Sequence, residues 1–392
     1  MILSEVTSNR TFRNPIEVNT GNSSFLNLGD FMIKTRICEM LDIEYPILQA
    51  AMGPFDTKDL AVAVATAGGF GMVSHPAPRL EDGLFEAIQN EEAKQRAIEN
   101  VTERMMAAIC EVAQKAQGTF GVNFRVAPEQ PDVPFLLDAL LEERDKNSNL
   151  QKKLKMVLCS AGDPTQPHLK KIQDAGMLRF HTVPSVYHAK KAEKSGVDGL
   201  IVTGYEAGGH VAYEPIHTFV AVPEVVKEVD VPVVGGGGVC DGKGLVAMLA
   251  FGALGIYVGT RFIVTKECEF NDKVKEEIIA SSAKFPKKAA TIVTQGVYGP
   301  LRHLKNRYSL ELFELTQKMQ RGEISIMDVL FFETEGTYRA KGPEGNIEDG
   351  AIWAGQASLR IHDLLTCEDL ISKIMNEAHQ ILNKFNKTYD RK

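Results

Sequence analysis

The sequence predicts an α/β fold, a TIM (β/α)8 barrel with a helical C-terminal addition. Between about residues 32 and 265, eight short apolar segments alternate with helical segments, and a closed barrel requires eight such units. The apolar segments are rich in Val, Ile and Leu, as in parallel strands buried on both faces. This stretch is also close to the roughly 250 residues that such a barrel occupies. An open doubly wound sheet remains an alternative, because the alternation alone does not separate the two arrangements.

The first half of the predicted barrel has four strands, and a long helix gives its clearest pattern. Apolar residues stand at Ile98, Val101, Met105, Ile109 and Val112, which places them on one face of a helix. The strands are expected at 46–50, 69–73, 119–123 and 156–160, and shorter helices at 58–67 and 134–143.

The second half is more regular, with short helices that end at glycines. Asp241 is a suitable N-cap for the helix that ends near Phe251 and Gly252. The other helices are expected at 165–175, 185–194 and 219–228, and the strands at 179–182, 199–203, 231–234 and 255–258.

The strand pattern stops after Thr265. Residues 266–392 are therefore expected to form a helical C-terminal region packed on the barrel at 32–265, and residues 1–31 a disordered N-terminal extension. Within the C-terminal region, helices are expected at 310–320, 325–330 and 370–385, with a polar loop at 336–350.

Charge and composition exclude several classes of protein. The chain has 44 Lys and Arg against 51 Asp and Glu, a net charge of −7, which disfavours nucleic-acid binding. No apolar run approaches the roughly 20 residues of a membrane span, and the polar N-terminus resembles no signal peptide. Six cysteines without CxxC spacing indicate reduced thiols in a cytoplasmic protein, and no histidine pair has the spacing of a metal site.

The ends of the last two predicted strands indicate a phosphate site. In a barrel of this type, the loops after strands seven and eight often bind phosphate. Gly237 and Gly238 follow strand seven, and Gly259 and Thr260 follow strand eight. Glycines allow backbone N–H groups to approach phosphate oxygens, and Thr260 adds a hydroxyl donor. The alternative is that the glycines only form tight turns.

His210 is the best candidate for acid–base chemistry, because an ordinary histidine titrates near neutral pH. It follows strand six after Gly208 and Gly209, which would let the loop pass close to a flat ligand. A surface histidine is the alternative. We expect His217, on the same loop, to be solvated, and His181, in a predicted strand, to be packed in the core.

Other catalytic signatures are missing from the sequence. It contains no GxSxG nucleophile motif and no GxxxxGK[ST] phosphate loop. Residues 235–238 do not form a GxGxxG motif in the first βα unit, which disfavours a dinucleotide site of the Rossmann type.

The ordered set of these segments resembles the FMN-dependent nitronate monooxygenase family, formerly called 2-nitropropane dioxygenase. That superfamily also includes flavin-dependent enoyl-acyl-carrier-protein reductases and an NADH:quinone reductase group. The matching segments are 35–36 (TR), 45–52 (YPILQAAM), 67–71 (AGGFG), 121–123 (GVN), 206–210 (EAGGH), 237–242 (GGVCDG), 259–262 (GTRF) and 353–356 (WAGQ).

The resemblance implies a barrel that binds FMN non-covalently at the carboxyl ends of its strands. His210 matches the catalytic histidine of the family. Thr203 stands where the family often has Gln, so its contact would be shorter or would pass through water. The residues expected to hold the phosphate are Gly237, Gly238, Gly259 and Thr260, and those expected to border the rest of the cofactor are Met52, Asn123, Thr203, Gly208 and Tyr257.

The strand-four segment 158–164 (LCSAGDP) favours the reductase branches, because nitronate monooxygenases carry a pattern that resembles His-Phe-Gly there. The expected activity is therefore NAD(P)H-dependent reduction of an enoyl thioester or a quinone, on a small-molecule or acyl-thioester substrate. Oxidation of alkyl nitronates with O₂ is the alternative. Whether the chain forms a homodimer stays open.

Three further interpretations stay open at this point. The chain could be a flavin-binding barrel without activity, or a barrel enzyme that acts on a phosphorylated substrate without flavin. The latter chemistry would need a cysteine in the loop after strand six, and residues 203–224 contain none.

Arg302, Lys305 and Arg307 lie in a stretch that looks like a loop. They could meet an anionic substrate, although a solvated basic patch is the simpler interpretation.

Overall fold

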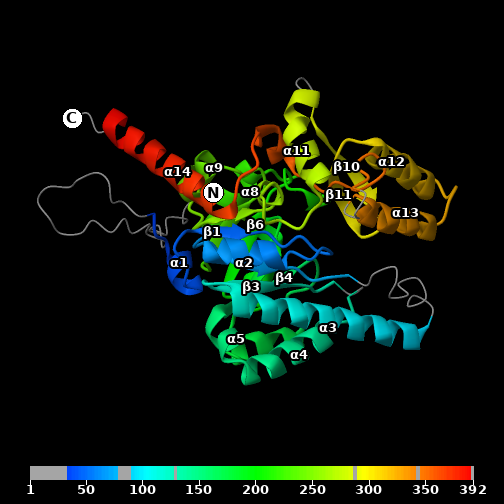
Figure 1. Cartoon of the computed structure of the whole chain (residues 1–392), viewed down its shortest axis with the longest axis horizontal. Helices are drawn as coiled ribbons and strands as arrows, with labels where there is room; N and C mark the ends of the chain where they lie inside the picture. The colour runs from blue at the N-terminus through cyan, green and yellow to red at the C-terminus, as the bar shows by residue number, and fades with distance from the viewer. Residues whose placement is uncertain (1–32, 78–89, 128–129, 286–288, 341–344, 390–392) are drawn as a thin grey trace, which may run out of the picture.

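The computed structural model describes residues 33–77, 90–127, 130–285, 289–340 and 345–389 (Figure 1). Its centre is a sheet of eight parallel strands in the order β1-β9-β8-β6-β5-β4-β3-β2. The strands are β1 (Ile47–Gln49), β2 (Gly71–Val73), β3 (Phe120–Arg125), β4 (Leu154–Ser160), β5 (Leu178–Val183), β6 (Gly199–Thr203), β8 (Val233–Gly236) and β9 (Ile256–Val258).

The two ends of this strand order meet and close the sheet. A parallel bridge joins Leu48 to Phe70, with the Gln49 amide donating to the Phe70 carbonyl over 2.9 Å. An open doubly wound sheet would leave these two edges unpaired. The predicted TIM barrel is therefore confirmed, and the open sheet is excluded.

Alternate side chains of each strand fill the inside of the barrel. They form a buried apolar cluster, to which helix α1 (Arg36–Leu41) adds Ile37, Cys38 and Leu41. Because this interior is packed, the chemistry must lie at the carboxyl ends of the strands. The inward residues include Leu48, Phe70, Met72, Met156, Leu158, Phe180, Ile201, Val234 and Tyr257.

Helices surround the barrel where the alternation predicts them. The long apolar stripe from Ile98 to Val112 lies on α3 and is buried, and from Val101 onward it belongs to the cluster that contains the strand residues Phe120 and Val157. Asp241 caps α9, accepting a hydrogen bond from the Gly244 amide over 3.0 Å. None of the helices within the described residues is both long and apolar enough to cross a membrane. The helices are α2 (Lys58–Thr66), α3 (Glu91–Lys115), α4 (Val133–Lys146), α5 (Ser148–Lys153), α6 (Lys171–Asp174), α7 (Val186–Lys194), α8 (Thr218–Glu228) and α9 (Gly242–Ala250).

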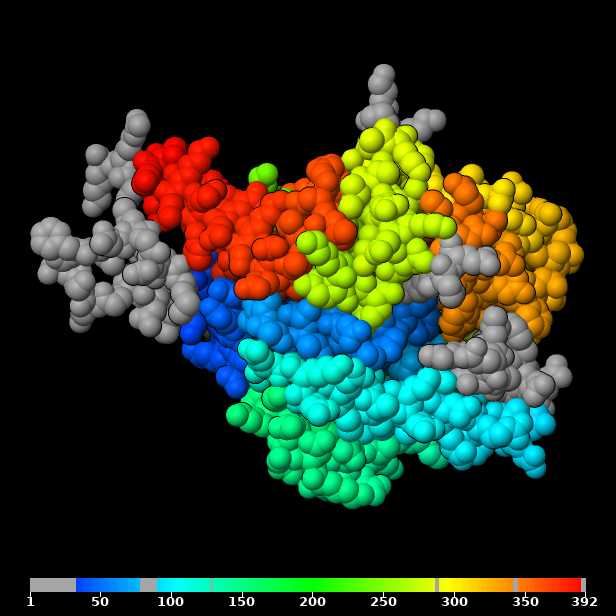
Figure 2. Space-filling view, viewed as in Figure 1, coloured from blue at the N-terminus to red at the C-terminus, as the bar shows by residue number. Residues whose placement is uncertain are grey.

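The last helix, α14 (Cys367–Tyr389), occupies the place of the eighth barrel helix. The segment that directly follows the eighth strand is only the short α10 (Thr260–Ile263). Instead, α14 packs against α9 and α2 on the barrel wall, with Ile374 and Ala378 buried there. Figure 1 shows it beside α9, and in Figure 2 its red atoms also adjoin the yellow-green ones of α11. The division of the chain at residue 265 stays a prediction, and the structure adds that the helix ring is completed by the chain's own end.

The part between α10 and α14 is not purely helical, contrary to the prediction for this region. It contains an antiparallel hairpin, β10 and β11, whose second strand pairs with the short β7. The hairpin is missed because its strands have no long apolar run. The elements are β7 (Gly209–His210), α11 (Asp272–Lys284), β10 (Thr291–Gly296), β11 (Gly299–Leu304), α12 (Arg307–Gln320), α13 (Ile326–Arg339) and the 3₁₀ helix η4 (Gln356–Arg360).

The predicted loop at 336–350 begins too early. Helix α13 continues through Gly336 to Arg339. A Cβ atom at Gly336 would lie 1.9 Å from the Tyr308 ring, so the glycine allows α13 to approach α12 rather than ending the helix. The predicted extension 1–31 and residues 341–344 of this loop lie outside the described residues.

The packing of α14 predicts a large stability loss from one buried substitution. Ile374→Ala should lower the free energy of unfolding by about 3 kcal/mol, because it leaves a cavity against α9 and α2. Urea unfolding followed by circular dichroism measures the change. Asn376→Ala, at an exposed position of the same helix, is the control and should change it by less than about 0.5 kcal/mol. Equal effects of the two substitutions would contradict this placement of α14.

Candidate active site

The predicted cofactor residues come together at the carboxyl end of the barrel. Neighbouring strands bring them side by side: Thr203 pairs with Gly236, and Gly236 pairs with Tyr257. The hairpin β10–β11 and helices α12 and α13 are grouped beside one end of the barrel (Figure 1). The pairing of β7 with β11 ties this group to the loop after β6.

The turn after β8 requires glycine at two successive positions. Gly237 and Gly238 have φ angles of +94° and +75°, which other residues rarely adopt. A Cβ atom at Gly237 would also lie 2.8 Å from the Thr218 hydroxyl. The glycines therefore do form a tight turn, as the alternative interpretation stated. Backbone N–H groups in a turn of this kind can also meet phosphate oxygens.

Gly259 and Thr260 differ from that turn, because the protein itself does not demand a glycine at 259. Its φ is −106°, and a Cβ atom there would only touch that of Ala50, at 3.4 Å. The Thr260 hydroxyl accepts a hydrogen bond from the Gly355 amide over 2.9 Å. The hydroxyl hydrogen thus remains available to donate to a ligand.

Two polar side chains at the ends of β3 and β6 have capacity for a ligand. Thr203 Oγ1 is buried and has no hydrogen-bond partner within the described residues. Asn123 donates from Nδ2 to the Leu158 carbonyl over 2.9 Å and to Ser160 Oγ over 3.0 Å, which directs its side-chain oxygen elsewhere. A buried polar atom without a partner is costly, so Thr203 fits a site that a polar cofactor fills.

The other three predicted cofactor residues are held mainly by the protein. The Met52 amide donates to Ser74 Oγ over 2.8 Å, and the Tyr257 hydroxyl accepts from the Ala51 amide over 2.7 Å. A Cβ atom at Gly208 would lie 2.5 Å from the Gly355 nitrogen. The chain's own crossing at Gly355 thus explains the glycine at 208, whatever ligand lies nearby.

His210 lies in β7, opposite Leu301 of β11, with its ring 6.1 Å from that of Trp353 in an edge-on arrangement. Part of the residue is open to solvent, but loss of hydration by the protein packed around the ring lowers the pKa of His210 to about 4, and the charge of Arg125 lowers it further. The histidine is therefore neutral at pH 7. It can donate a hydrogen bond from one ring nitrogen, but it is not a ready source of a proton as an imidazolium.

Sequence reasoning missed His303, which lies on β11 near His210. His303 is fully buried, and both of its ring nitrogens lack a partner within the described part of the chain. Burial lowers its pKa to about 3, and His210 adds to this effect. No sequence signal marked this residue, because the hairpin that carries it was not predicted.

Arg125 was also missed, although a signal for it exists. It lies at the end of β3, two residues after Asn123, and residues two apart in a strand share a face. An inward Asn123 therefore implies that Arg125 points toward the mouth of the barrel.

The remaining sequence candidates are placed elsewhere. His217 is exposed, 3.3 Å from the Glu206 carboxylate, and His181 is buried as predicted. The basic stretch does not form a patch, because Arg302 is buried on β11 with its guanidinium over the Tyr205 ring. Arg307 is exposed and pairs with Asp349.

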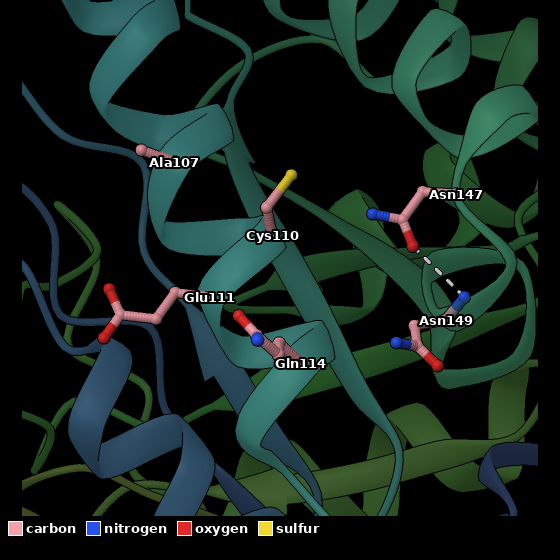
Figure 3. A pocket seen from close by; sticks show the side chains of 6 residues that line it. All are labelled: Ala107, Cys110, Glu111, Gln114, Asn147 and Asn149. Carbon is pink, nitrogen blue, oxygen red and sulfur yellow. Dashed lines mark hydrogen bonds between the residues drawn. The ribbon is translucent and has the colours of Figure 1, made fainter.

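A separate pocket lies on the outer face of the barrel (Figure 3). It has a volume of about 440 Å³ and lies between α3 and the residues that begin α5. None of its lining residues is on a barrel strand or on the loop after one, so it is unrelated to the site at the strand ends. Its lining residues are Ala107, Cys110, Glu111, Gln114, Asn147 and Asn149. No group of three or more metal-binding side chains occurs in the portion of the chain that the structure describes.

The comparisons with known proteins agree with the resemblance. A dehydrogenase of Rhodococcus jostii RHA1, named for a hydroxy-methyl-oxo-octahydroindene carboxyl-CoA substrate, is 28% identical over 88% of this chain and 96% of its own. A Staphylococcus aureus protein named "Probable nitronate monooxygenase" is 27% identical over 89% of this chain and 98% of its own.

Solved structures match over the same extent. FabK from Thermotoga maritima has a TM-score of 0.73 and 28% identity over 91% of this chain and 99% of its own. Nitroalkane oxidase from Streptomyces ansochromogenes has a TM-score of 0.69 and 22% identity over 89% and 99%, which supports the fold. The family model described as nitronate monooxygenase matches residues 34–377. The chain therefore belongs to the nitronate monooxygenase family of oxidoreductases.

Proposed function

We propose that the chain is an FMN-dependent enzyme that uses NAD(P)H to reduce an activated double bond, as in an enoyl thioester, or a quinone. The observation that carries this proposal is the group formed by the buried, unpartnered Thr203 hydroxyl, the Gly237–Gly238 turn and the Thr260 hydroxyl at the strand ends. The CoA thioester in the name of the Rhodococcus relative supports a thioester substrate. Family membership disfavours both a barrel without activity and a flavin-free barrel enzyme.

The residues present fit FMN. Gly237, Gly238, Gly259 and Thr260 would hold the phosphate, because backbone amides and a free hydroxyl hydrogen can meet its oxygens there. Thr203 and Asn123 would meet polar atoms of the ring or the ribityl chain, with Met52, Gly208 and Tyr257 beside them. When bound, FMN supplies hydride transfer between reductant and substrate.

His210 would orient the substrate and stabilise charge on it. A neutral imidazole donates one N–H hydrogen bond, which can hold the thioester carbonyl or quinone oxygen as it gains negative charge. The Trp353 ring packs edge-on against the imidazole, with the two ring centroids 6.1 Å apart, and helps to hold its orientation.

A second candidate is nitronate oxidation, and Arg125 favours it. The Arg125 charge acts on His210, and a nitronate is an anion that such a charge would attract. In this reaction His210 would orient the nitronate, and O₂ would be the oxidant. The Staphylococcus relative supports this alternative by name.

The FMN proposal predicts that Thr260→Val weakens cofactor binding about tenfold, because one hydrogen bond to a charged group is lost. Fluorescence titration of the FMN-stripped protein measures the dissociation constant. Thr316→Val, which replaces a buried threonine on α12, is the matched control and should leave it unchanged. A Thr260→Val protein with normal affinity for FMN would exclude this phosphate contact.

The reductase proposal predicts rapid bleaching of the flavin absorbance when the loaded protein is mixed anaerobically with NADH or NADPH. Propionate 3-nitronate is tested in parallel, under the same conditions. Bleaching by the nitronate alone would replace the reductase with the nitronate monooxygenase candidate. A purified protein that takes up no FMN would remove both.

The role of His210 predicts a specific pH profile. His210→Ala should retain FMN and lower kcat/KM by roughly 10²- to 10⁴-fold. In the unaltered protein, kcat/KM should show no inflection from His210 between pH 6 and 8, because its pKa of about 4 keeps it neutral there. Any inflection that comes from His210 should lie near pH 4 instead. An inflection near pH 6.5 that His210→Ala abolishes would contradict a neutral histidine. His188→Ala, on the exposed side of α7, is the control for histidine loss.

A further inference from the structure

Arg125 is held firmly at the end of β3. Its backbone amide donates to Nδ1 of His75 over 3.0 Å. The Nε2 of His75 lies 2.8 Å from the Asp132 carboxylate, so His75 donates there and accepts from Arg125. His75 is fully buried, and its burial lowers its pKa, which keeps the ring neutral and this hydrogen-bond chain fixed.

The guanidinium of Arg125 is largely unpartnered. It donates from Nη2 to the Pro76 carbonyl over 3.1 Å, while its buried Nε has no acceptor within the described residues. No carboxylate of those residues forms an ion pair with Arg125. A buried cation without a partner lowers the stability of the fold unless an anion binds to it.

The charge of Arg125 is directed toward the proposed active site. It contributes to the lowered pKa of His210. Burial lowers the pKa of Arg125 itself, and Asp132, Tyr338 and Tyr298 oppose that effect. Tyr298 follows β10, and Tyr338 lies on α13, so Arg125 stands where the barrel mouth faces the C-terminal hairpin.

We propose that Arg125 binds a planar, singly charged, two-oxygen group of the substrate beside His210, either a carboxylate or a nitronate. The planar guanidinium matches such a group with two parallel hydrogen bonds. This inference rests on the proposed function in that it places the substrate at His210. It narrows the reductase substrate to an unsaturated compound that carries an anionic group close to the double bond.

The competing interpretation is an internal pair with Asp132. Oδ1 of Asp132 is also buried without a partner, and a small movement could bring it to Arg125. The two interpretations differ in what they predict for the unaltered protein compared with Asp132→Asn. If Arg125 binds the substrate, removing the neighbouring carboxylate leaves anion binding intact or tightens it. If Asp132 neutralises Arg125, anion binding is weak in the unaltered protein and appears only in Asp132→Asn.

The test compares benzoate with benzamide, which share a shape and differ in charge. Calorimetric titration into the oxidised, FMN-loaded protein should show benzoate binding at least tenfold more tightly. Arg125→Gln should weaken benzoate binding by roughly 10- to 100-fold, with benzamide unchanged. Arg144→Gln is the matched control, because Arg144 also donates to one backbone carbonyl and has a buried, unpartnered Nε, but lies on α4. It should have no effect.

Arg125→Lys keeps the positive charge but cannot make the two parallel hydrogen bonds of a guanidinium, so it should weaken benzoate binding less than Arg125→Gln does. It replaces Arg125→Gln in the test if that variant does not fold. Ethylnitronate and crotonate, titrated in the same way, show which anion the site takes, and Arg125→Gln should weaken whichever binds more tightly. Benzoate that binds no tighter than benzamide to the unaltered protein, or equally to Arg125→Gln, would overturn the inference. Because neither benzoate nor benzamide can reduce the flavin, their comparison is independent of whether NAD(P)H does so.

Discussion

The crossing of residues 354–356 over the loop after β6 holds the candidate site together. Gly208 and Gly355 approach so closely that neither tolerates a side chain. The Gly355 amide binds the Thr260 hydroxyl, and the Gln356 amide binds the Glu206 carbonyl over 2.9 Å. One segment thus fixes the proposed phosphate contact, the loop that carries His210 and the Trp353 ring beside it. The barrel provides the strand ends, but this crossing decides how the C-terminal part closes over them.

The barrel could be predicted because its signals are local. Buried parallel strands are continuous apolar runs, and the amphipathic helices repeat with their own period. The turn at Gly237 and Gly238 could be predicted for the same reason, because residues other than glycine rarely adopt two successive positive φ angles. These signals do not depend on partners that are distant in the chain.

What the sequence did not disclose depends on distant partners. The β10–β11 hairpin is stabilised by pairing with β7, about eighty residues earlier, so its strands carry no strong pattern of their own. The role of α14 as the eighth barrel helix depends on α9 and α2. His303 became a neighbour of His210 only through this hairpin. Arg125 was within reach of strand periodicity, but its missing partner could be recognised only from the structure.

The electrostatics of the site favour binding an anion over storing a proton. His210 and His303 have pKa values of about 4 and about 3, so neither carries charge at neutral pH. Arg125 is then the cation that acts on His210, and no carboxylate among the described residues forms an ion pair with it. Protonation of His210 would place a second positive charge beside that of Arg125. Binding of an anion would instead neutralise the charge of Arg125. A substrate that brings its own negative charge therefore completes this site, whereas a neutral one leaves Arg125 uncompensated.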